Sequence, residues 1–284
     1  MNLRPLPAEL HPLFPPGGAD ERRLSAELPA GRVIRSDERE GGAPVLWLGD
    51  GPATAAAYAR FRADHARSGL QPLLLDALDP DDDAYRPWAC GELFPPKESG
   101  GEPEPAPEHA EWWRGHTGVA DGDEAEQDDD ERFSEVFAPF GTGWPGLAPA
   151  PAPAGDPGRL ADALARELLA MSPWLRLGLV AAPSAAAALT VAGWSGPVNM
   201  SGDITAFSAV LDDWERRFGA RVVAVGFATL RLSVAAPPVG REAALALAAE
   251  HFAFCPDNIW QGAGSVGAYA EAIDGMREWY FWWD

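Results

Sequence analysis

The second half of the chain contains a segment whose apolar residues recur every three or four positions. Such spacing is typical of an α-helix that buries one face, and the charged residues of the segment fall on the opposite face. Gly219 follows the segment, as expected for a residue that ends a helix. We therefore predict an amphipathic helix that begins at Asp203 or Thr205. Its apolar positions are Phe207, Val210, Leu211, Trp214 and Phe218.

Two other segments alternate between apolar and polar residues, as β-strands do. Residues 221–234 alternate twice around a short turn, which predicts a β-hairpin. Residues 279–284 place Trp279, Phe281 and Trp283 on one face, and aromatic residues also stand on the other face. We expect a strand that is covered on both faces and joins the hairpin, so that the chain ends inside its own core. Its deletion should unfold the domain.

The first half contains a strand–helix–strand pattern. Two short strand-like pieces lie in residues 32–48, a helical segment covers 53–67, and an apolar strand follows at 70–78. A Gly-rich turn, Gly49 to Pro52, joins strand and helix and resembles a phosphate-binding loop. It lacks a third glycine and a Lys-Ser or Lys-Thr pair, so we interpret Asp50 as the cap of the helix.

Composition divides the chain into three parts. Residues 1–96 form an N-terminal α/β region, 97–158 an acidic and Pro/Gly-rich linker, and 159–284 a C-terminal domain. The predicted class is α+β, with a mixed or antiparallel sheet of about four strands and packed helices in the C-terminal domain, preceded by the smaller βαβ region. The pattern leaves open whether the two halves share one sheet.

The net charge of −21 is concentrated in the linker, where residues 97–135 hold 14 acids and 3 bases. A protein this acidic repels nucleic acid and anionic membranes, so we expect neither as a partner. The apolar stretches are too short to span a membrane, and prolines interrupt the start of the chain, which favours a cytoplasmic location. Two cysteines, Cys90 and Cys255, fit reduced thiols.

The linker raises two questions of metal binding. Residues 121–131 carry eight acids, but they lack the glycine and the terminal glutamate of a calcium-binding loop, so a solvated segment is the better interpretation. His109 and His116 do not form a metal-binding motif and are expected to face solvent. The neighbouring Trp112 and Trp113 suggest that part of the linker docks on a folded domain. We expect no metal and no cofactor.

The C-terminal motifs resemble a known family. The ordered segments "SAVLDDWERRFGARVVAVGF", "LRLSVAAPP", "AAEHFAFCPDNIWQG" and the terminal "FWWD" are similar to the bacterial domain of unknown function 4253 family, marked by Phe-Trp-Trp near the C-terminus. The resemblance covers about residues 175–284. It implies no activity, substrate or cofactor.

The segment "HFAFCPDNIWQG" holds three residue types that are used in catalysis, His251, Cys255 and Asp257. Cys255 lies at the C-terminal end of its helix, where the helix dipole disfavours a thiolate, so we interpret it as a small buried side chain. Asp257 and the residue after it fit a turn cap. Alternatively, they join a polar binding cluster with the "NMSGD" turn. The candidate binding residues are Asn199, Asp203, Asp257, Asn258, Gln261 and Trp282.

Two functions remain as hypotheses. The first is a non-enzymatic protein-interaction module, immunity-like or regulatory, that binds a basic protein partner, since negative charge suits such a partner and no catalytic set is recognisable. The second is an enzyme that acts on a small polar molecule. Its candidate residues are Asn199, Asp203, His251, Asp257 and Asn258. The sequence does not indicate the oligomeric state.

Overall fold

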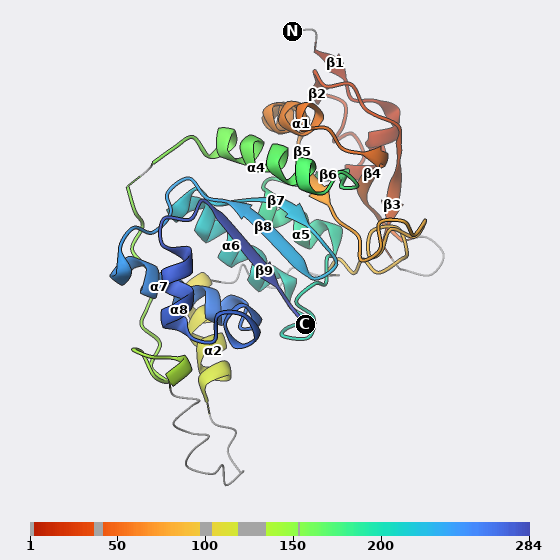
Figure 1. Ribbon diagram of the computed structural model, residues 1–284. Helices are drawn as coiled ribbons and strands as arrows, with labels where there is room; N and C mark the ends of the chain where they lie inside the picture. Colours follow the sequence, from red (N-terminus) through yellow and green to blue (C-terminus); the bar gives the residue numbers. More distant parts are fainter. Residues whose placement is uncertain (1–2, 37–41, 97–103, 119–134, 153) are drawn as a thin grey trace.

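The protein is described here by a computed structural model, which places residues 3–36, 42–96, 104–118, 135–152 and 154–284. Within these residues seven strands form one mixed sheet in the order β3-β4-β6-β5-β7-β8-β9, and β1 and β2 form a small second sheet (Figure 1). The strands are β1 (Arg4–Pro5), β2 (Arg23–Leu24), β3 (Gly31–Arg35), β4 (Pro44–Pro52), β5 (Leu70–Leu75), β6 (Arg176–Ala181), β7 (Arg221–Val225), β8 (Thr229–Ser233) and β9 (Glu278–Trp282). The helices are η1 (Ala8–Leu13), α1 (Ala55–Ser68), α2 (Pro105–Thr117), α4 (Pro157–Met171), α5 (Ala185–Ala192), α6 (Ile204–Phe218), α7 (Arg241–Phe254), η2 (Asn258–Ala263) and α8 (Val266–Ile273).

Both halves of the chain contribute to the large sheet. Strand β6 inserts between β4 and β5 and runs antiparallel to each of them, while β5 runs parallel to β7. The predicted unit of β4, α1 and β5 is therefore present, with a strand from the second half in its middle. The α+β class is confirmed. Four strands come from the predicted C-terminal domain, and β3, β4 and β5 extend the same sheet.

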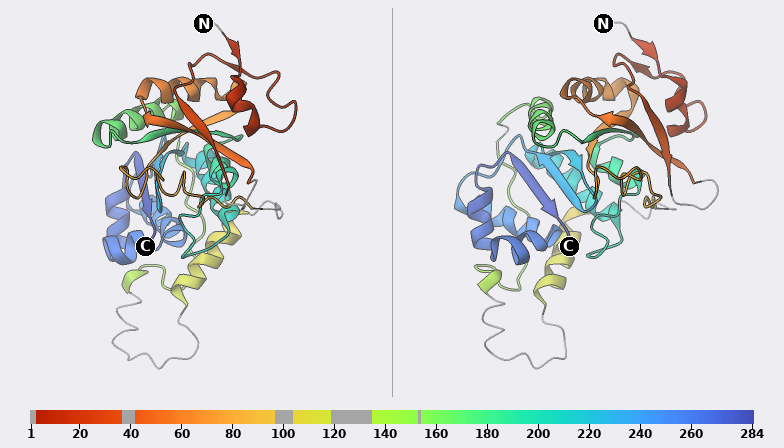
Figure 2. Two further views of the ribbon diagram at one scale, coloured as in Figure 1. Left: turned by 90° about the vertical axis from the view of Figure 1, so that its right-hand side faces the viewer. Right: turned by 45° about the vertical axis from the view of Figure 1, so that its right-hand side comes forward.

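Helices cover the two faces of the sheet unequally. Helices α1 and α4 pack on one face, where Tyr58 and Leu164 meet Leu74 and Val223. Helices α2, α5, α6, α7 and α8 pack on the other face and enclose the main core (Figure 2). The predicted apolar face of α6 is fully buried, and Gly219 ends this helix in a left-handed conformation. No described helix is long and apolar enough to cross a membrane.

Strand β9 joins the hairpin of β7 and β8, as the alternation predicted. Trp279, Phe281 and Trp283 are buried against the helices, at 1%, 0% and 5% exposure. The expectation of cover on both faces is wrong, because β9 is the edge strand and Tyr280 on its outer face is 40% exposed. Helix α4 contacts β7 and β8, so the outer surface of β9 stays open.

Part of the predicted linker is helical and docked. Helix α2 buries Trp113, and Trp112 stacks on Phe207 of α6. The expectation that His109 faces solvent is wrong, because its ring lies buried and stacked on Trp144. His116 is largely enclosed and lies 3.2 Å from the Ala253 oxygen. The acidic run 121–131, with the rejected calcium site, lies outside the described residues.

The turn between β4 and α1 also differs from expectation. Strand β4 continues through Asp50 to Pro52, and Thr54 caps α1 by accepting a hydrogen bond from Ala57 N–H at 3.1 Å. Asp50 instead forms an exposed ion pair with Arg32. The predicted cap was therefore placed four residues too early, because the strand extends past the Gly-rich turn.

The two faces of β9 predict opposite outcomes for neighbouring substitutions. Phe281→Ala should lower the free energy of unfolding by about 3–5 kcal/mol, because it opens a cavity among Trp214, Phe254 and Trp283. Tyr280→Ala should lower it by less than about 1 kcal/mol, since it removes an exposed ring and its contact with Arg231. Denaturant unfolding of both variants measures the difference. Equal losses would contradict the assigned orientation of the strand.

Candidate functional site

Three of the predicted binding residues meet at Asp284. Asn199 donates from Nδ2 to the backbone oxygen of Asp284 at 2.7 Å. Asp257 accepts the Asp284 N–H at 3.1 Å, and Gln261 donates to Asp257 Oδ1 at 3.1 Å. The turns that carry Asn199 and Asp257 therefore lie side by side. The residue that they hold is part of the chain itself.

Asn258 takes the place of a neighbouring strand at the edge of β9. Its Nδ2 donates to the Tyr280 oxygen at 2.6 Å, and its Oδ1 accepts the Trp282 N–H at 3.3 Å. Cys255 Sγ lies 2.9 Å from the Trp282 oxygen and donates to it. An edge strand presents unpaired backbone groups, and these two side chains satisfy them. Burial raises the pKa of the Cys255 thiol to about 12, so the thiol stays protonated at neutral pH.

His251 lies inside the aromatic core. The ring centroids of Trp279 and Phe281 are 4.6 Å and 4.8 Å from the centroid of His251. Its Nδ1 contacts the Tyr269 hydroxyl at 3.2 Å, and its buried Nε2 has no hydrogen-bond partner among the described residues. Burial, with the nearby His109 and Arg217, holds the pKa of His251 well below its usual value. The imidazole is therefore neutral and enclosed.

Asp203 and Trp282 have separate environments. Asp203 caps α6, where its carboxylate accepts the Thr205 N–H at 2.9 Å. Trp282 is half-buried and lines a groove of about 320 Å³ between β9 and α8, together with Ile273 and Met276. In the described parts of the chain, no group of three or more His, Cys, Asp or Glu side chains is arranged to hold a metal ion.

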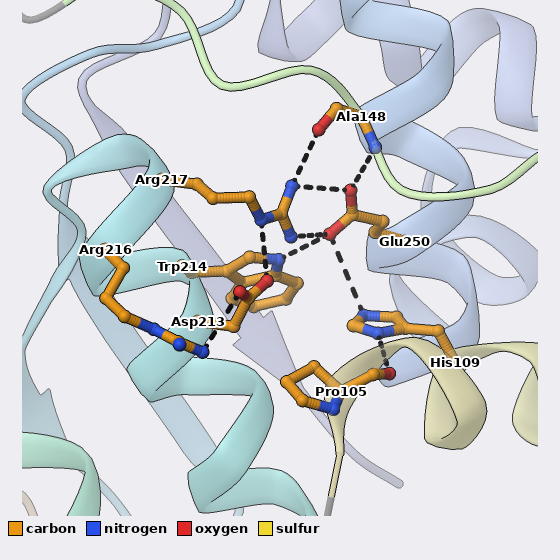
Figure 3. Close-up of polar contacts among 8 residues, drawn as sticks. All are labelled: Pro105, His109, Ala148, Asp213, Trp214, Arg216, Arg217 and Glu250. Carbon is orange, nitrogen blue, oxygen red and sulfur yellow. Dashed lines mark hydrogen bonds and ion pairs between the residues drawn. The ribbon is translucent and has the colours of Figure 1, made fainter.

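A buried carboxylate, Glu250, accepts hydrogen bonds from three residues, two on α6 and one in the connector that contains Ala148 (Figure 3). It accepts the Ala148 N–H at 2.6 Å and the Trp214 indole N–H at 2.7 Å. Both terminal nitrogens of Arg217 also donate to it, and Arg217 in turn binds Asp213 and the Ala148 oxygen. Because donors surround both carboxylate oxygens, Glu250 acts as a fixed structural anion.

His109 faces this network from α2. Its Nδ1 lies 2.8 Å from the Pro105 oxygen and must donate, so Nε2 carries the lone pair. Nε2 lies 3.9 Å from Glu250 and makes no hydrogen bond with the described residues (Figure 3). Burial lowers the pKa of His109, against the opposing effect of Glu250. A neutral histidine thus rests against a charged pair.

The sequence interpretation missed this network, although it contained one signal. Glu250 interrupts the otherwise apolar run "AALALAAEHFAF", and a lone acid on a buried helix face requires a partner. The spacing places Arg217 among the charged residues on the face opposite to the apolar residues, so the sequence predicts that it is exposed. Its partner could not be found, since Glu250 lies 33 residues away on another helix.

The outer surface of β9, with the part of β8 beside it, lies at the edge of the sheet next to α4, which contacts β7 and β8 (Figure 2). We call it the open sheet face, formed by Thr229, Arg231, Tyr280 and Trp282. The Arg231 guanidinium lies over the Tyr280 ring at 4.5 Å and pairs with Glu278 at 2.6 Å.

Trp174 and the loop after β5 border the open sheet face. The indole N–H of Trp174 donates to Asp76 at 2.9 Å, while 41% of the Trp174 surface stays exposed. Burial raises the pKa of Tyr280, with Arg231 opposing and Asp76 adding to the effect, which places Asp76 within electrostatic range of this face. The loop is acidic, with six carboxylates and one arginine from Asp76 to Pro96. Asp79, Asp81, Asp82 and Asp83 are exposed.

The Glu250 network predicts unequal effects of two adjacent arginines. Arg217→Met should lower the free energy of unfolding by about 3–5 kcal/mol, because it leaves a buried carboxylate without its cation. Arg216→Met is the matched control: its side chain is 69% exposed, so its ion pair contributes less than about 1 kcal/mol. Denaturant unfolding at neutral pH measures both. A mild effect of Arg217→Met would contradict a structural role of the network.

The buried histidines predict a loss of stability in acid. Burial lowers the pKa of His109, His116 and His251 in the folded state, so the unfolded chain binds more protons below about pH 6.5. Each group can remove about 1.4 kcal/mol per pH unit as the pH falls below that value. Unfolding curves between pH 7.5 and 5.5 should show this slope.

The variant His251→Phe should flatten the slope, since phenylalanine does not titrate. Tyr269→Phe is its control, because it removes the contact with His251 and keeps the titrating ring. A slope unchanged by His251→Phe would show that this histidine does not contribute.

Residues 176–284 match the model of a family described as Domain of unknown function (DUF4253). The match confirms the resemblance drawn from the C-terminal motifs, and it begins at β6. No curated protein and no solved structure matches the chain. The C-terminal part of the protein, from Arg176 to Asp284, thus matches a family whose description names no activity.

Proposed function

We propose that the protein is a non-catalytic, intracellular interaction module that binds a basic protein partner through its open sheet face. The observation that carries the proposal is the combination of exposed aromatic rings with surrounding carboxylates. Trp174 and Tyr280 are 41% and 40% exposed, and Leu78 in the loop after β5 is 59% exposed. Tryptophan and tyrosine are the side chains most often found as anchors of protein interfaces.

Charge supports a basic partner. The loop that borders the open sheet face presents Asp79, Asp81, Asp82 and Asp83 to solvent, and the whole chain carries a net charge of −21. Arg231 and Arg86 each pair with a glutamate, Glu278 and Glu92. The surface therefore favours a cationic protein, which the carboxylates attract before the aromatic residues make contact.

The hydrogen bonds of the candidate catalytic residues favour binding over catalysis. A general acid or base must reach a substrate proton at hydrogen-bond distance. Asn258 is occupied by the edge of β9, Asp257 by Asp284, and His251 is enclosed by aromatic rings. These contacts leave the open sheet face as the best supported functional surface.

The proposal is tested in two stages with the full chain. The immobilised protein first captures partners from a lysate of its source cells, and the captured protein is then purified and titrated against variants. Trp174→Ala and Tyr280→Ala should each weaken binding by about 1–3 kcal/mol. Exchange of Asp79, Asp81, Asp82 and Asp83 for Asn should slow association and reduce its dependence on salt.

The matched control neutralises four exposed acids elsewhere, Glu9, Asp20, Glu21 and Glu27, with the same change in net charge. It should leave the affinity within about threefold of the parent value if binding depends on the location of the charges. Equal losses in the two charge variants would point to nonspecific attraction. Full affinity after both aromatic substitutions would reject the open sheet face.

A further inference from the structure

A polar cavity of about 200 Å³ lies at the end of the sheet where β5 and β7 begin. It is built by segments from both halves of the chain, since α1 lines it together with α4, α6 and the start of α5. Cavities between structural units are the usual places for small-molecule sites. The functional side chains that line it are Tyr58, Arg62, His65, Ser184, Glu215 and Arg221.

The side chains that line the cavity carry two positive charges and one negative charge, although Asp162 and Asp212 lie behind them and bind Arg62 and Ser184. Its lining includes two guanidinium groups, Arg62 and Arg221, and one carboxylate, Glu215. Arg62 is held in place by Asp162 through two hydrogen bonds of 2.6 Å. Arg221 lies 3.3 Å from Glu215, but its buried Nε makes no hydrogen bond with the described residues. Its Nε is therefore held by the ion pair with Glu215, while its two terminal nitrogens make no hydrogen bond with the described residues and can donate to a ligand.

Tyr58 supplies an independent sign of a ligand. It is 1% exposed, lines the cavity, and its hydroxyl has no hydrogen-bond partner in the described parts of the chain. The hydroxyl therefore depends on water or a ligand in the cavity for a hydrogen-bond acceptor. Burial raises the pKa of Tyr58, which keeps the hydroxyl protonated as a donor.

The start of α5 adds further donors. Ser184 caps this helix by accepting the Ala187 N–H at 3.0 Å and donates its own hydrogen to Asp212 at 2.8 Å. The first N–H groups of a helix lack partners within the helix and attract anions. His65 lies 2.8 Å from the Ala182 oxygen, so Nε2 donates there and the ring stays fixed at the cavity wall.

We propose that this cavity binds a small oxyanion, a carboxylate or phosphate group, between Arg221, the Tyr58 hydroxyl and the first turn of α5. Glu215 stands beside the anion and opposes it. Burial raises the pKa of Glu215, with Arg221 opposing and Asp212 adding to the effect, so that its carboxyl takes up a proton more readily than an exposed one. This site is separate from the open sheet face, which borders the loop that follows the other end of β5.

The test titrates the full-length protein with inorganic phosphate and with succinate at pH 7.5 by calorimetry. We expect saturable binding of one anion per chain by at least one probe. Phosphate alone would indicate a phosphorylated ligand, succinate alone a carboxylic acid, and both a general oxyanion site. Arg221→Met should weaken binding about tenfold or more and Tyr58→Phe about threefold or more, because each removes a donor.

Two further variants separate the site from nonspecific effects. Arg166→Met removes an equal charge from the exposed side of α4 and should leave the affinity unchanged. Glu215→Gln should tighten binding several-fold, a gain that a purely structural role for Glu215 does not produce. The proposal is overturned if neither probe saturates, or if Tyr58→Phe and Arg221→Met bind as tightly as the parent protein while unfolding normally.

Discussion

The buried pair of Glu250 and Arg217 is the interaction on which the arrangement of this protein depends. Taking both charges out of water is unfavourable, and their attraction offsets this only when every remaining donor and acceptor is satisfied. Three separate segments form the hydrogen bonds that make the pair tolerable. Helix α6 supplies Trp214 and Arg217, α7 supplies the Glu250 carboxylate, and the connector of residues 135–152 supplies the backbone groups of Ala148. The connector must therefore stay in place for the pair to be tolerated. This links the route of the chain between its two halves to the packing of the main core.

The same helices also receive the aromatic residues of β9. Trp214 contacts Glu250 through its indole nitrogen and stacks on Phe281 through its ring, at a centroid distance of 5.5 Å. Trp214 thus connects the Glu250 network to the aromatic residues of β9 that are buried against the helices. Aromatic burial contributes most of the free energy, since each large ring contributes about 1.5–3 kcal/mol, whereas the ion pair chiefly fixes which arrangement is allowed. The outer face of β9 takes no part in this closure and is free to contact a partner.

The periodicity of the sequence predicts the individual helices and strands of this fold far better than it predicts which of them lie side by side. The buried face of α6, the β7–β8 hairpin and the addition of β9 follow from local spacing, because side-chain direction repeats along a helix or strand. The insertion of β6 between β4 and β5 does not follow, since all three strands are apolar and would pair equally well in other orders. The candidate site shows the same limit. The proximity of Asn199 and Asp257 agrees with the alternative interpretation of their turns, whereas the burial of His109 and the pairing of Glu250 with Arg217 depend on contacts between distant segments.

The hydrogen bonds show what the polar side chains of the C-terminal motifs do in this fold. The two segments that carried the resemblance, "CPDNIWQ" and "FWWD", bind each other: Cys255 and Asn258 satisfy the free edge of β9, and Asp257 and Gln261 contact Asp284. Their polar side chains are therefore used to close the sheet, because an unsatisfied edge would otherwise recruit another strand. A residue occupied in this way has little left to offer a substrate or partner. The two proposed sites use other groups: the outward-facing rings of Tyr280 and Trp282 on the open sheet face, and the side chains of the cavity where both halves of the chain meet.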